Sequence, residues 1–449
     1  MYTWPLRRFL VNDIFDGYAR DETKGRRVNP VVKDVGYGYD PEEELCLEKV
    51  TPGISYQDSD FTLANDQHLA VKEILKWLYE SPRYRKPFMR LSGNAGTGKT
   101  LCISYLIQNS AELFPRYMKL RPPAVCTFTW KAALVLQSRN VPACSIHSIF
   151  YEPNGEGKDG EVTFKRRTPE MIRESYSMII VDESSMVNSE MRTDIEAIGL
   201  PVLYVGDSGQ LPAISEDPED EFFMERAELR LTEVRRQALD SPIIRLSIDI
   251  REGKYIPYGK YGDGVFKVTP DDISDNVLIK TDQLICGRND TRQALNRKVR
   301  RLLGHDVRTL PNENERLIGL NNLPERQMFN GQAWTADANY SDFRLENSHK
   351  TVMAIRGDDG TKRIQQCWFP EDLQYKSFPQ KGHAAKFMKE NNIYLVDYGY
   401  ALTCHKMQGS SAKRPVIFEE RLGDKKFHKR WLYTAVTRAV EKVFIVSNG

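Results

Sequence analysis

The 449-residue chain lacks the features that mark several large classes of protein. Its seven cysteines include no Cys-x-x-Cys pair, so neither a zinc knuckle nor a disulfide framework is indicated, and free thiols in a reducing compartment are expected. No apolar run approaches the roughly 18 residues of a membrane-spanning helix. The apolar stretch at the start is too short and too charged for a signal peptide. These absences predict a soluble, cytoplasmic protein that contacts no membrane.

An excess of charge of either sign is also missing. The 64 Lys and Arg residues nearly balance the 62 Asp and Glu residues, which leaves a formal net charge of +2. Any basic groove must therefore be local and balanced by acidic residues elsewhere. A hydrophobic content of 40% is enough for real cores, and the length predicts roughly two to four domains.

One glycine-rich segment is far more specific than the composition. Residues 93–100 read Gly-Asn-Ala-Gly-Thr-Gly-Lys-Thr and match the phosphate-binding pattern G-x-x-x-x-G-K-[ST]. The glycines allow a tight turn whose amide N–H groups point at phosphate oxygens, Lys99 reaches the β- and γ-phosphates, and Thr100 offers a hydroxyl to Mg²⁺. A strand expected over 87–92 and a helix over 101–114 flank the segment, which disfavours a plain turn. The residues expected to hold the ATP phosphates are Gly93, Asn94, Ala95, Gly96, Thr97, Gly98, Lys99 and Thr100.

Beyond this segment, short β-rich runs alternate with helix-like stretches, which is typical of an α/β protein with a parallel sheet and helical crossovers. The runs are Ala124–Thr129, Met178–Val181, Val202–Val205, Gln283–Cys286, Val416–Phe418 and Val443–Val446. Residues 152–168 predict a β-hairpin insertion, and the turns within residues 330–373 predict a small β-barrel-like insert. Residues 1–60 show no clear period.

Polar side chains follow two of the expected strands. Residues 178–183 read Met-Ile-Ile-Val-Asp-Glu, and the carboxyl ends of strands line the ligand crevice of an open α/β sheet. Asp182 can hold Mg²⁺ directly or through water, and Glu183 can polarise the water that attacks the γ-phosphate. Gln210, in a Gly-Asp-Ser-Gly-Gln-Leu-Pro string, can hydrogen-bond a γ-phosphate and report its loss without titrating. A solvated acidic strand end and an ordinary turn are the respective alternatives.

In this order the motifs resemble those of superfamily 1 helicases, and within them the RecD/Dda branch, superfamily 1B. The resemblance covers about residues 62–449. It adds Asn65-Asp66-Gln67 as an adenine-reading motif, residues 127–133 and 145–149 as contacts to single-stranded DNA, residues 231–237 with an arginine on the γ-phosphate, residues 401–410, and residues 433–439 with an arginine finger.

The resemblance implies a role for each matching residue. Catalytic roles fall to Lys99, Asp182, Glu183, Gln210, Arg236 and Arg438. Nucleotide contacts are implied for Gln67 and Gly409 in addition to the phosphate loop, and a Mg²⁺ site for Thr100 and Asp182. DNA contacts are implied for Thr129, Trp130, Lys131, His147, Phe164, Thr403, His405 and Lys406.

The same resemblance implies a domain organisation. It predicts two RecA-like motor domains, one over 61–233 and the other over 234–329 and 394–449. A pin-like hairpin at about 150–172 would interrupt the first, and an SH3-like β-barrel over 330–393 would interrupt the second. Residues 1–60 would form an N-terminal extension that could bind a partner, cover the motor or add DNA contacts.

Several residues keep two interpretations. Trp130 stands where relatives carry a smaller residue; it could pack under the hairpin or support Phe164, which is either an aromatic near the tip of a separating pin or a hairpin core residue. His147 could be a core histidine rather than a DNA neighbour. The basic run 425–430 could contact phosphates or form a solvated face.

The resemblance predicts an ATP- and Mg²⁺-dependent, DNA-stimulated motor that moves along single-stranded DNA, 5′→3′, and unwinds duplexes in replication, recombination or repair. The expected partners are single-stranded and forked DNA, with a single-stranded-DNA-binding protein or replisome component as a further candidate. A monomeric motor is expected, in the host cytoplasm if a phage encodes it. The rivals are a remodelling translocase, the motor subunit of a recombination nuclease complex, and a P-loop nucleotide kinase, against which the arginines at 236 and 438 argue.

Overall fold

The computed structural model describes residues 63–156, 162–215, 217–234, 240–307, 310–321, 330–345, 348–357, 362–368 and 393–448, together with residues 323, 326, 328 and 360. The extension expected over residues 1–60 lies outside this part of the chain. No helix in the described part combines the length and apolar character needed to span a bilayer.

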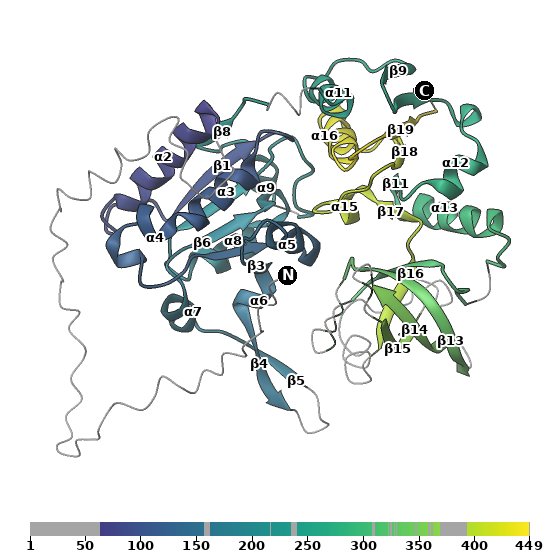
Figure 1. Ribbon diagram of the computed structural model, residues 1–449, viewed down its shortest axis with the longest axis horizontal. Helices are drawn as coiled ribbons and strands as arrows, with labels where there is room; N and C mark the ends of the chain where they lie inside the picture. The colour runs from purple at the N-terminus through teal and green to yellow at the C-terminus, as the bar shows by residue number, and fades with distance from the viewer. Residues whose placement is uncertain are drawn as a thin grey trace, which may run out of the picture. The chain divides into compact units, whose positions relative to one another are not determined.

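A six-stranded parallel sheet carries the phosphate-binding loop (Figure 1). Its strands are β1 (Phe88–Gly93), β2 (Ala124–Thr127), β3 (Ala143–Ser145), β6 (Ile179–Asp182), β7 (Val202–Gly206) and β8 (Leu229–Leu231). They lie in the order β3-β2-β6-β7-β1-β8, and every neighbouring pair runs parallel. The strands are near-continuous apolar runs because helices cover both faces of the sheet. The parallel α/β fold predicted from the sequence is confirmed.

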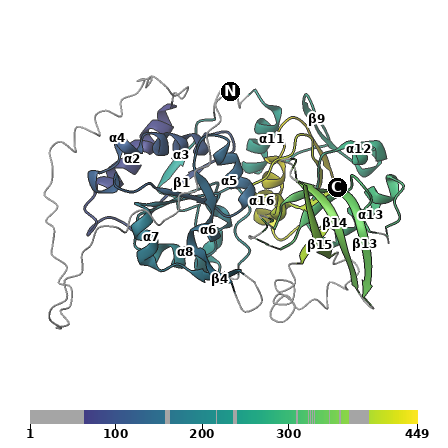
Figure 2. The same ribbon diagram turned by 60° about the horizontal axis from the view of Figure 1, so that its bottom comes forward.

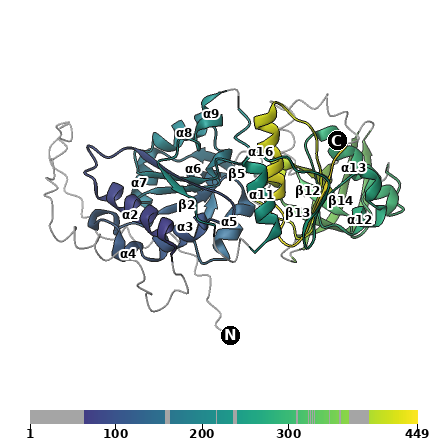
Figure 3. The ribbon, with the colours of Figure 1, turned by 90° about the horizontal axis from the view of Figure 1, so that it is seen from above.

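Helices cover the two faces of this first sheet, as Figure 3 shows for α2, α3 and α5 on one side and α8 and α9 on the other. The helices are α2 (Asn65–Tyr79), α3 (Lys99–Gln108), α4 (Ser110–Leu113), α5 (Trp130–Gln137), α6 (Ile146–Phe150), α7 (Pro169–Ser175), α8 (Ser189–Glu196) and α9 (Glu219–Phe222), with 3₁₀ turns η2 (Arg116–Met118) and η3 (Ser184–Met186). One core packs Ile74, Ile103 and Leu136 against the sheet, and the other packs Ile149 and Ile195. Each such buried side chain contributes about 1.5–3 kcal/mol relative to exposure.

Two expected elements end earlier than the sequence indicates. The helix expected over 101–114 stops at Gln108, where the Asn109 side chain donates to the Tyr105 carbonyl 2.8 Å away and competes with the helical hydrogen bonds. The strand expected to reach Thr129 stops at Thr127, because the Thr129 side chain accepts the Ala132 N–H and caps α5.

A second six-stranded sheet follows in the chain. Its strands are β9 (Gly259–Gly262), β10 (Val265–Val268), β11 (Leu284–Cys286), β17 (Ala401–Thr403), β18 (Val416–Phe418) and β19 (Val443–Val446), in the order β17-β11-β18-β19-β10-β9. Only the edge strand β9 runs antiparallel to its neighbour. The accompanying helices are α11 (Pro242–Arg251), α12 (Asp275–Lys280), α13 (Asn289–Leu302), α15 (Cys404–Met407) and α16 (Lys425–Val436), with the 3₁₀ turn η4 (Pro270–Asp272). Figures 1 and 2 show α11 and α16 side by side, and their apolar faces share one core.

A closed barrel interrupts the second sheet in sequence. Its strands are β12 (Arg316–Gly319), β13 (Ala333–Leu345), β14 (Ser348–Gly357), β15 (Lys362–Trp368) and β16 (Tyr394–Tyr398). Neighbours run antiparallel except β15 and β16. Since β12 and β16 close the barrel, its strands extend beyond the 330–393 insertion expected from the sequence on both sides. Local turn signals could not reveal that flanking segments join the barrel.

The expected hairpin is present as β4 (Tyr151–Glu156) paired antiparallel with β5 (Val162–Arg166). The main chain of Phe164 pairs with that of Pro153, and the register shifts between Pro153 and Glu156. The side chain of Phe164 lies outside what the structure describes, so its proposed contact with DNA stays a prediction.

Candidate nucleotide-binding site between two sheets

The phosphate-binding loop joins the end of β1 to the start of α3 and depends on its glycines. Gly96 and Gly98 have φ values of 80° and 85°, in the left-handed region that favours glycine. A Cβ at Gly98 would lie 2.3 Å from the amide nitrogen of Gln67, and one at Gly93 would lie 2.5 Å from the Thr97 hydroxyl. The backbone therefore follows a tight path that only glycine allows at these positions.

Lys99 lies over this loop at the start of α3. Its ammonium donates to the carbonyl oxygens of Gly93 (2.7 Å) and Asn94 (3.1 Å). Thr100 follows in the first helical turn, where orphan N–H groups and the helix dipole favour an anion. The loop thus places a cation, a hydroxyl and backbone donors around one small volume.

Gln67 on α2 supports the loop from behind. The side chain is buried, its amide donates to the Thr97 carbonyl (2.7 Å), and its oxygen accepts the Ala64 N–H (3.0 Å). These bonds direct the carboxamide at the protein backbone. The expected contact between Gln67 and adenine therefore stays a prediction.

The two carboxylates lie where β6 ends. Asp182 is buried and accepts the Glu183 N–H (2.9 Å), and burial, followed by the charge of Glu183, raises its pKa above the ordinary value, while Lys99 acts in the opposite direction. Glu183 has φ of 53°, an uncommon conformation for a residue with a side chain, and strain of this kind clusters at functional sites.

The loop after β7 connects the first sheet to the second. Gln210 is buried beside Leu211, whose N–H donates to the Thr434 hydroxyl (2.9 Å) and whose carbonyl accepts from the Gln408 side chain (3.0 Å). Both partners come from second-sheet segments. The position of Gln210 is therefore tied to α16 and to the loop after α15.

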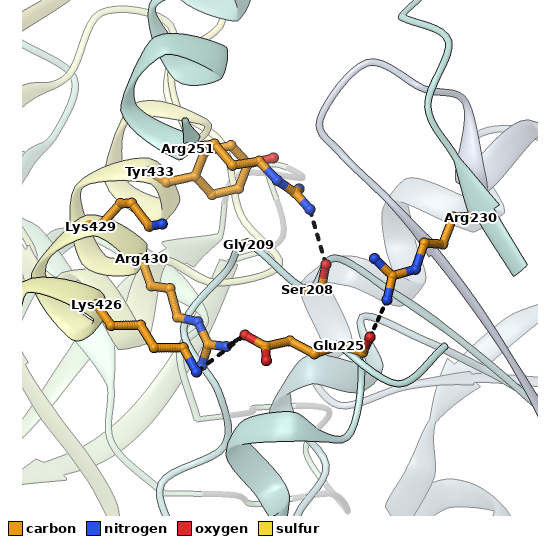
Figure 4. Close-up of a pocket in the computed structure, with 9 residues that line it drawn as sticks. All are labelled: Ser208, Gly209, Glu225, Arg230, Arg251, Lys426, Lys429, Arg430 and Tyr433. Atoms are coloured by element: carbon orange, nitrogen blue, oxygen red, sulfur yellow. Dashed lines mark hydrogen bonds and ion pairs between the residues drawn. The ribbon is translucent and has the colours of Figure 1, made fainter. Parts of the chain in front are cut away.

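A pocket of about 340 Å³ lies where the loop after β7 meets α11 and α16 (Figure 4). Its lining residues are Ser208, Gly209, Glu225, Arg230, Arg251, Lys426, Lys429, Arg430 and Tyr433. Arg251 pairs with the buried Asp207 (3.1 Å), and Arg430 pairs with Glu225. Tyr433 donates to Asp207 (2.7 Å) and accepts the N–H of Ala95 in the phosphate loop (3.0 Å). The second sheet thus touches the phosphate loop directly.

The two predicted arginines have different outcomes. The Arg438 guanidinium is buried and donates to the carbonyls of Thr434 (3.2 Å) and Ser410 (3.3 Å) and to the Thr437 hydroxyl (3.3 Å). It is thus held at the end of α16 by its own half of the molecule. Arg236 lies outside the described residues.

The predicted DNA-binding residues fall into two groups that meet at one point. Thr129 caps α5, on which Trp130 and Lys131 occupy the first turn. A Cβ at Gly409 would lie 2.6 Å from the Thr129 hydroxyl, so Gly409 lies against a segment predicted to contact DNA, and its predicted contact with the nucleotide stays a prediction. The structure therefore brings the start of α5, including its cap Thr129, next to the loop after α15.

The remaining DNA candidates whose side chains are described lie on α6, at the end of β17 and on α15. His147 is exposed on α6. Thr403 ends β17 and caps α15 by accepting the Lys406 N–H (3.4 Å). Burial lowers the pKa of His405, whose ring lies 6.4 Å from that of Phe427, and burial lowers the pKa of Lys406 to about 8.

These residues fit an ATP–Mg²⁺ group. Buried oxygens of Glu183, Ser185 and Gln210 have no hydrogen-bond partner among the described residues, close to the acidic end of β6. In the same part of the chain, no group of three or more His, Cys, Asp or Glu side chains could hold a metal alone. Mg²⁺ is usually bound by one or two carboxylates together with substrate phosphates, so Asp182 and Thr100 are a suitable donor set.

Two families match this chain. The AAA domain family matches residues 62–263, which hold all strands of the first sheet together with α11 and β9. The UvrD-like helicase C-terminal domain family matches residues 398–446, which hold β17, β18 and β19 of the second sheet. By these matches the chain resembles superfamily 1B helicases of the RecD/Pif1 type. The family resemblance expected from the sequence is confirmed.

Individual relatives of this branch are distant in sequence. The chain is 25% identical over 367 residues to the ATP-dependent RecD2 DNA helicase of Deinococcus radiodurans, a match that covers 79% of this chain and 46% of the relative. It is 29% identical over 143 residues to the ATP-dependent DNA helicase PIF1 of Saccharomyces cerevisiae, covering 28% of this chain and 16% of the relative. The chain thus spans less than half the length of these relatives.

Solved structures of Pif1 helicases share the fold. A Bacteroides Pif1 helicase in complex with ADP-AlF3 and single-stranded DNA has 17% identity and a TM-score of 0.51, covering 87% of this chain and 93% of that one. Two coordinating Pif1 helicases at forked double-stranded DNA give 18% identity, a TM-score of 0.51, and coverage of 87% and 92%.

Sequence reasoning missed the residues that join the sheets. The sequence motifs assign no individual role to five residues: Asp207, Arg251, Gln408, Tyr433 and Thr434. The aspartate directly after an apolar strand in Gly-Asp-Ser-Gly-Gln was the available signal for Asp207. Nothing in the local pattern indicates that a tyrosine 338 residues away would reach Ala95.

Proposed function

We propose that this chain is an ATP-dependent DNA helicase that translocates on single-stranded DNA in the 5′→3′ direction and unwinds duplexes. The observation that carries the proposal is a set of hydrogen bonds from second-sheet side chains to two loops of the first sheet. Tyr433 bonds to Ala95 in the phosphate loop, and Thr434 and Gln408 bond to Leu211 beside Gln210. Because both loops of the first sheet are bonded to the second sheet, a change of nucleotide state at one must alter the contacts of the other.

Each predicted site residue has a part in this reaction. Bound ATP–Mg²⁺ supplies the γ-phosphate whose loss drives the cycle. The phosphate-loop amides and Lys99 bind the phosphates, and Thr100 and Asp182 hold the metal. Glu183 orients and deprotonates the attacking water, while Gln210 senses the γ-phosphate. Arg236 and Arg438 neutralise charge that develops in the transition state.

The grip on DNA is assigned to the junction between α5 and α15. Thr129, Trp130 and Lys131 on one side and Thr403, His405 and Lys406 on the other would hold a single strand through phosphate contacts and stacking. A Cβ added at Gly409 would lie only 2.6 Å from the Thr129 hydroxyl, so the backbone of Gly409 packs closely on Thr129. Small movements of the two sheets should therefore disturb this junction. Movement at the nucleotide would thereby shift one gripping surface against the other.

The proposal extends to the other parts of the chain. The sheets act as motor domains over 61–233 and over 234–329 with 394–449, the β4–β5 hairpin as a strand-separating pin with Phe164 near its tip, and the closed barrel as an SH3-like insertion. The partners are single-stranded and forked DNA, with a single-stranded-DNA-binding protein or replisome component in replication, recombination or repair.

Unwinding of duplexes with only a 5′ or only a 3′ single-stranded tail tests the proposal. ATP-dependent displacement from the 5′-tailed substrate alone is expected, with Lys99→Ala as the inactive control that still binds DNA. Displacement only from the 3′-tailed substrate would overturn the direction. ATP turnover that ignores added DNA would overturn the motor, and DNA-stimulated turnover without displacement would indicate a translocase.

A further inference from the structure

The Tyr433 hydroxyl occupies a backbone donor of the phosphate loop. It lies 3.0 Å from the Ala95 nitrogen and 2.7 Å from Oδ2 of Asp207. Tyr433 is fully enclosed in the last turn of α16, whereas Ala95 lies in the loop after β1. The phenol therefore forms a hydrogen-bonded bridge between the second sheet's helix and the loop that is expected to bind phosphate.

The direction of these bonds follows from the chemistry of the partners. An ionised carboxylate only accepts and a backbone N–H only donates, so the phenol proton points to Asp207 and an oxygen lone pair points to Ala95. Asp207 is fully buried and also accepts from Gly209 N–H (2.8 Å) and from Arg251 (3.1 Å). Burial, followed by the charge of Asp207, raises the pKa of Tyr433, which keeps the phenol protonated.

Tight packing holds the tyrosine in this position. The guanidinium of Arg251 lies 5.8 Å from the centre of the Tyr433 ring and donates to the Ser208 hydroxyl (3.0 Å), as Figure 4 shows. A Cβ at Gly209 would come within 3.1 Å of the ring and 3.0 Å of Arg251. The ring cannot move toward the loop after β7 without a change in that loop.

A nucleotide phosphate and the phenol compete for the same donor. The Ala95 N–H can satisfy either the Tyr433 oxygen or a phosphate oxygen in good geometry, because a backbone amide carries one hydrogen. When a phosphate takes it, the phenol keeps Asp207 and loses Ala95. The next residue of α16, Thr434, accepts the Leu211 N–H beside Gln210, so release at Tyr433 reaches the Gln210 loop through the same helix.

We propose that Tyr433 is a positioning residue that links occupancy of the phosphate loop to the second sheet, through competition for the Ala95 N–H. The inference rests on the proposed function only for its effect on DNA-stimulated turnover. The competition itself concerns nucleotide binding and stands without DNA.

Tyr433→Phe tests the competition because it keeps the ring and removes the hydroxyl. Without the phenol, the free protein no longer satisfies the Ala95 N–H, so a fluorescent, non-hydrolysable ATP analogue should bind about three- to tenfold more tightly in the absence of DNA. In turnover assays the ratio of rates with and without single-stranded DNA should fall, since the loop is no longer coupled to α16.

The matched control is Tyr204→Phe. Tyr204, on β7 of the first sheet, is also a buried phenol, but its hydroxyl donates to Glu196 (3.2 Å) and is not bonded to the phosphate loop. Removing that hydroxyl should leave analogue affinity and the DNA stimulation ratio unchanged. A shared effect in both variants would show a general loss of packing and would overturn the assignment.

A second variant protects the test against misfolding. Asp207→Asn no longer fixes the direction of the phenol proton, so the hold on Ala95 should weaken and analogue affinity should again rise. Unchanged or weaker analogue binding in folded Tyr433→Phe, judged by an unaltered cooperative melt, would overturn the proposal. A wild-type protein without DNA-stimulated turnover would instead contradict the proposed function and leave the DNA-free binding result to stand alone.

Discussion

The two six-stranded sheets share a parallel construction but bring different chemistry to the cleft. The first presents a glycine loop, Lys99 and two carboxylates directly at strand ends. The second presents no such loop among its described residues and approaches with side chains of α16 and the segment after α15. Strand ends suit binding because their geometry is rigid, whereas helix side chains suit coupling because a small rotation breaks their contacts. We expect the first sheet to supply the phosphate contacts and the base, and the second to supply the side chains that make turnover depend on the other half of the molecule.

The strongest test of this division is Arg438→Ala. The guanidinium belongs to the second sheet, so nucleotide affinity should change little while turnover falls about 10³- to 10⁵-fold, as for other arginine fingers. Single-turnover hydrolysis and analogue binding measure the two quantities separately. Because Arg438 is buried against three oxygens, a thermal melt must accompany them. Retained hydrolysis in the folded variant would remove the second sheet from the chemistry.

Glu183→Gln examines the first sheet in the same way. The change keeps size and removes the base, so turnover should fall about 10²- to 10⁴-fold with nucleotide affinity near that of the wild type. Glu190→Gln, at an exposed position in the first turn of α8, is the control and should leave turnover unchanged. Turnover within twofold of the wild type would exclude Glu183 as the base.

Gly409→Ala sharpens the comparison where the two halves touch. Gly409 has φ of 71° and would place its new methyl 2.6 Å from the Thr129 hydroxyl, so strain and overlap together should cost about 2–4 kcal/mol of unfolding free energy. Gly304→Ala is the matched control, since its φ of 81° carries the same strain with nothing within 4 Å. Chemical denaturation measures the unfolding free energy of both variants, and the difference between their losses is the cost of the overlap with Thr129. Equal losses of unfolding free energy would mean that this overlap costs nothing.

The smallest expected effect concerns pH and Lys406. Burial, aided by Arg292, lowers the pKa of Lys406 to about 8, so a phosphate contact made by its ammonium exists below that pH and is lost above it. Affinity for single-stranded DNA should fall about threefold between pH 7 and 9.5, the worth of one phosphate contact. Lys406→Arg should bind equally across this range, because arginine stays charged. An equal decline in both proteins would place the titration elsewhere.

The lowered pKa of Lys406 also makes the free energy of unfolding depend on pH. Its folded-state pKa of about 8 lies below the ordinary lysine value of 10.5, so between pH 8 and 10.5 the unfolded chain binds more protons than the folded one. The contribution of Lys406 to the free energy of unfolding therefore rises with pH across that window.

Local patterns predicted much of the fold. The expected strands at Val416–Phe418 and Val443–Val446 coincide with β18 and β19, because short apolar runs bounded by turn residues are a local signal. The phosphate loop was equally local. By contrast, β12 and β16 join a barrel through pairings 77 to 81 residues apart, which no window of neighbouring residues contains.

Some residues of the candidate site could be predicted from local motifs, and others could not. The residues of the phosphate loop and Asp182 follow from contiguous motifs, and the structure gathers them at the ends of β1 and β6, two strands of one sheet with β7 between them. Tyr433 and Gln408 depend on how helices of one half pack on loops of the other. Such contacts are decided by tertiary packing rather than by sequence period, so they were visible only in the structure.

The connection between barrel and second sheet has a mechanical meaning. Only Gly399 and Tyr400 separate β16 from β17, and a Cβ at Gly399 would lie 3.0 Å from the Leu317 carbonyl oxygen. Arg316, at the start of β12, also donates to the carbonyls of Thr281 and Asp282, which lie between α12 and the second-sheet strand β11. Because this connection is short and closely packed, a force on the barrel should be transmitted to Thr403 with little deformation. A DNA strand bound at Thr403 would therefore respond directly to movement of the barrel.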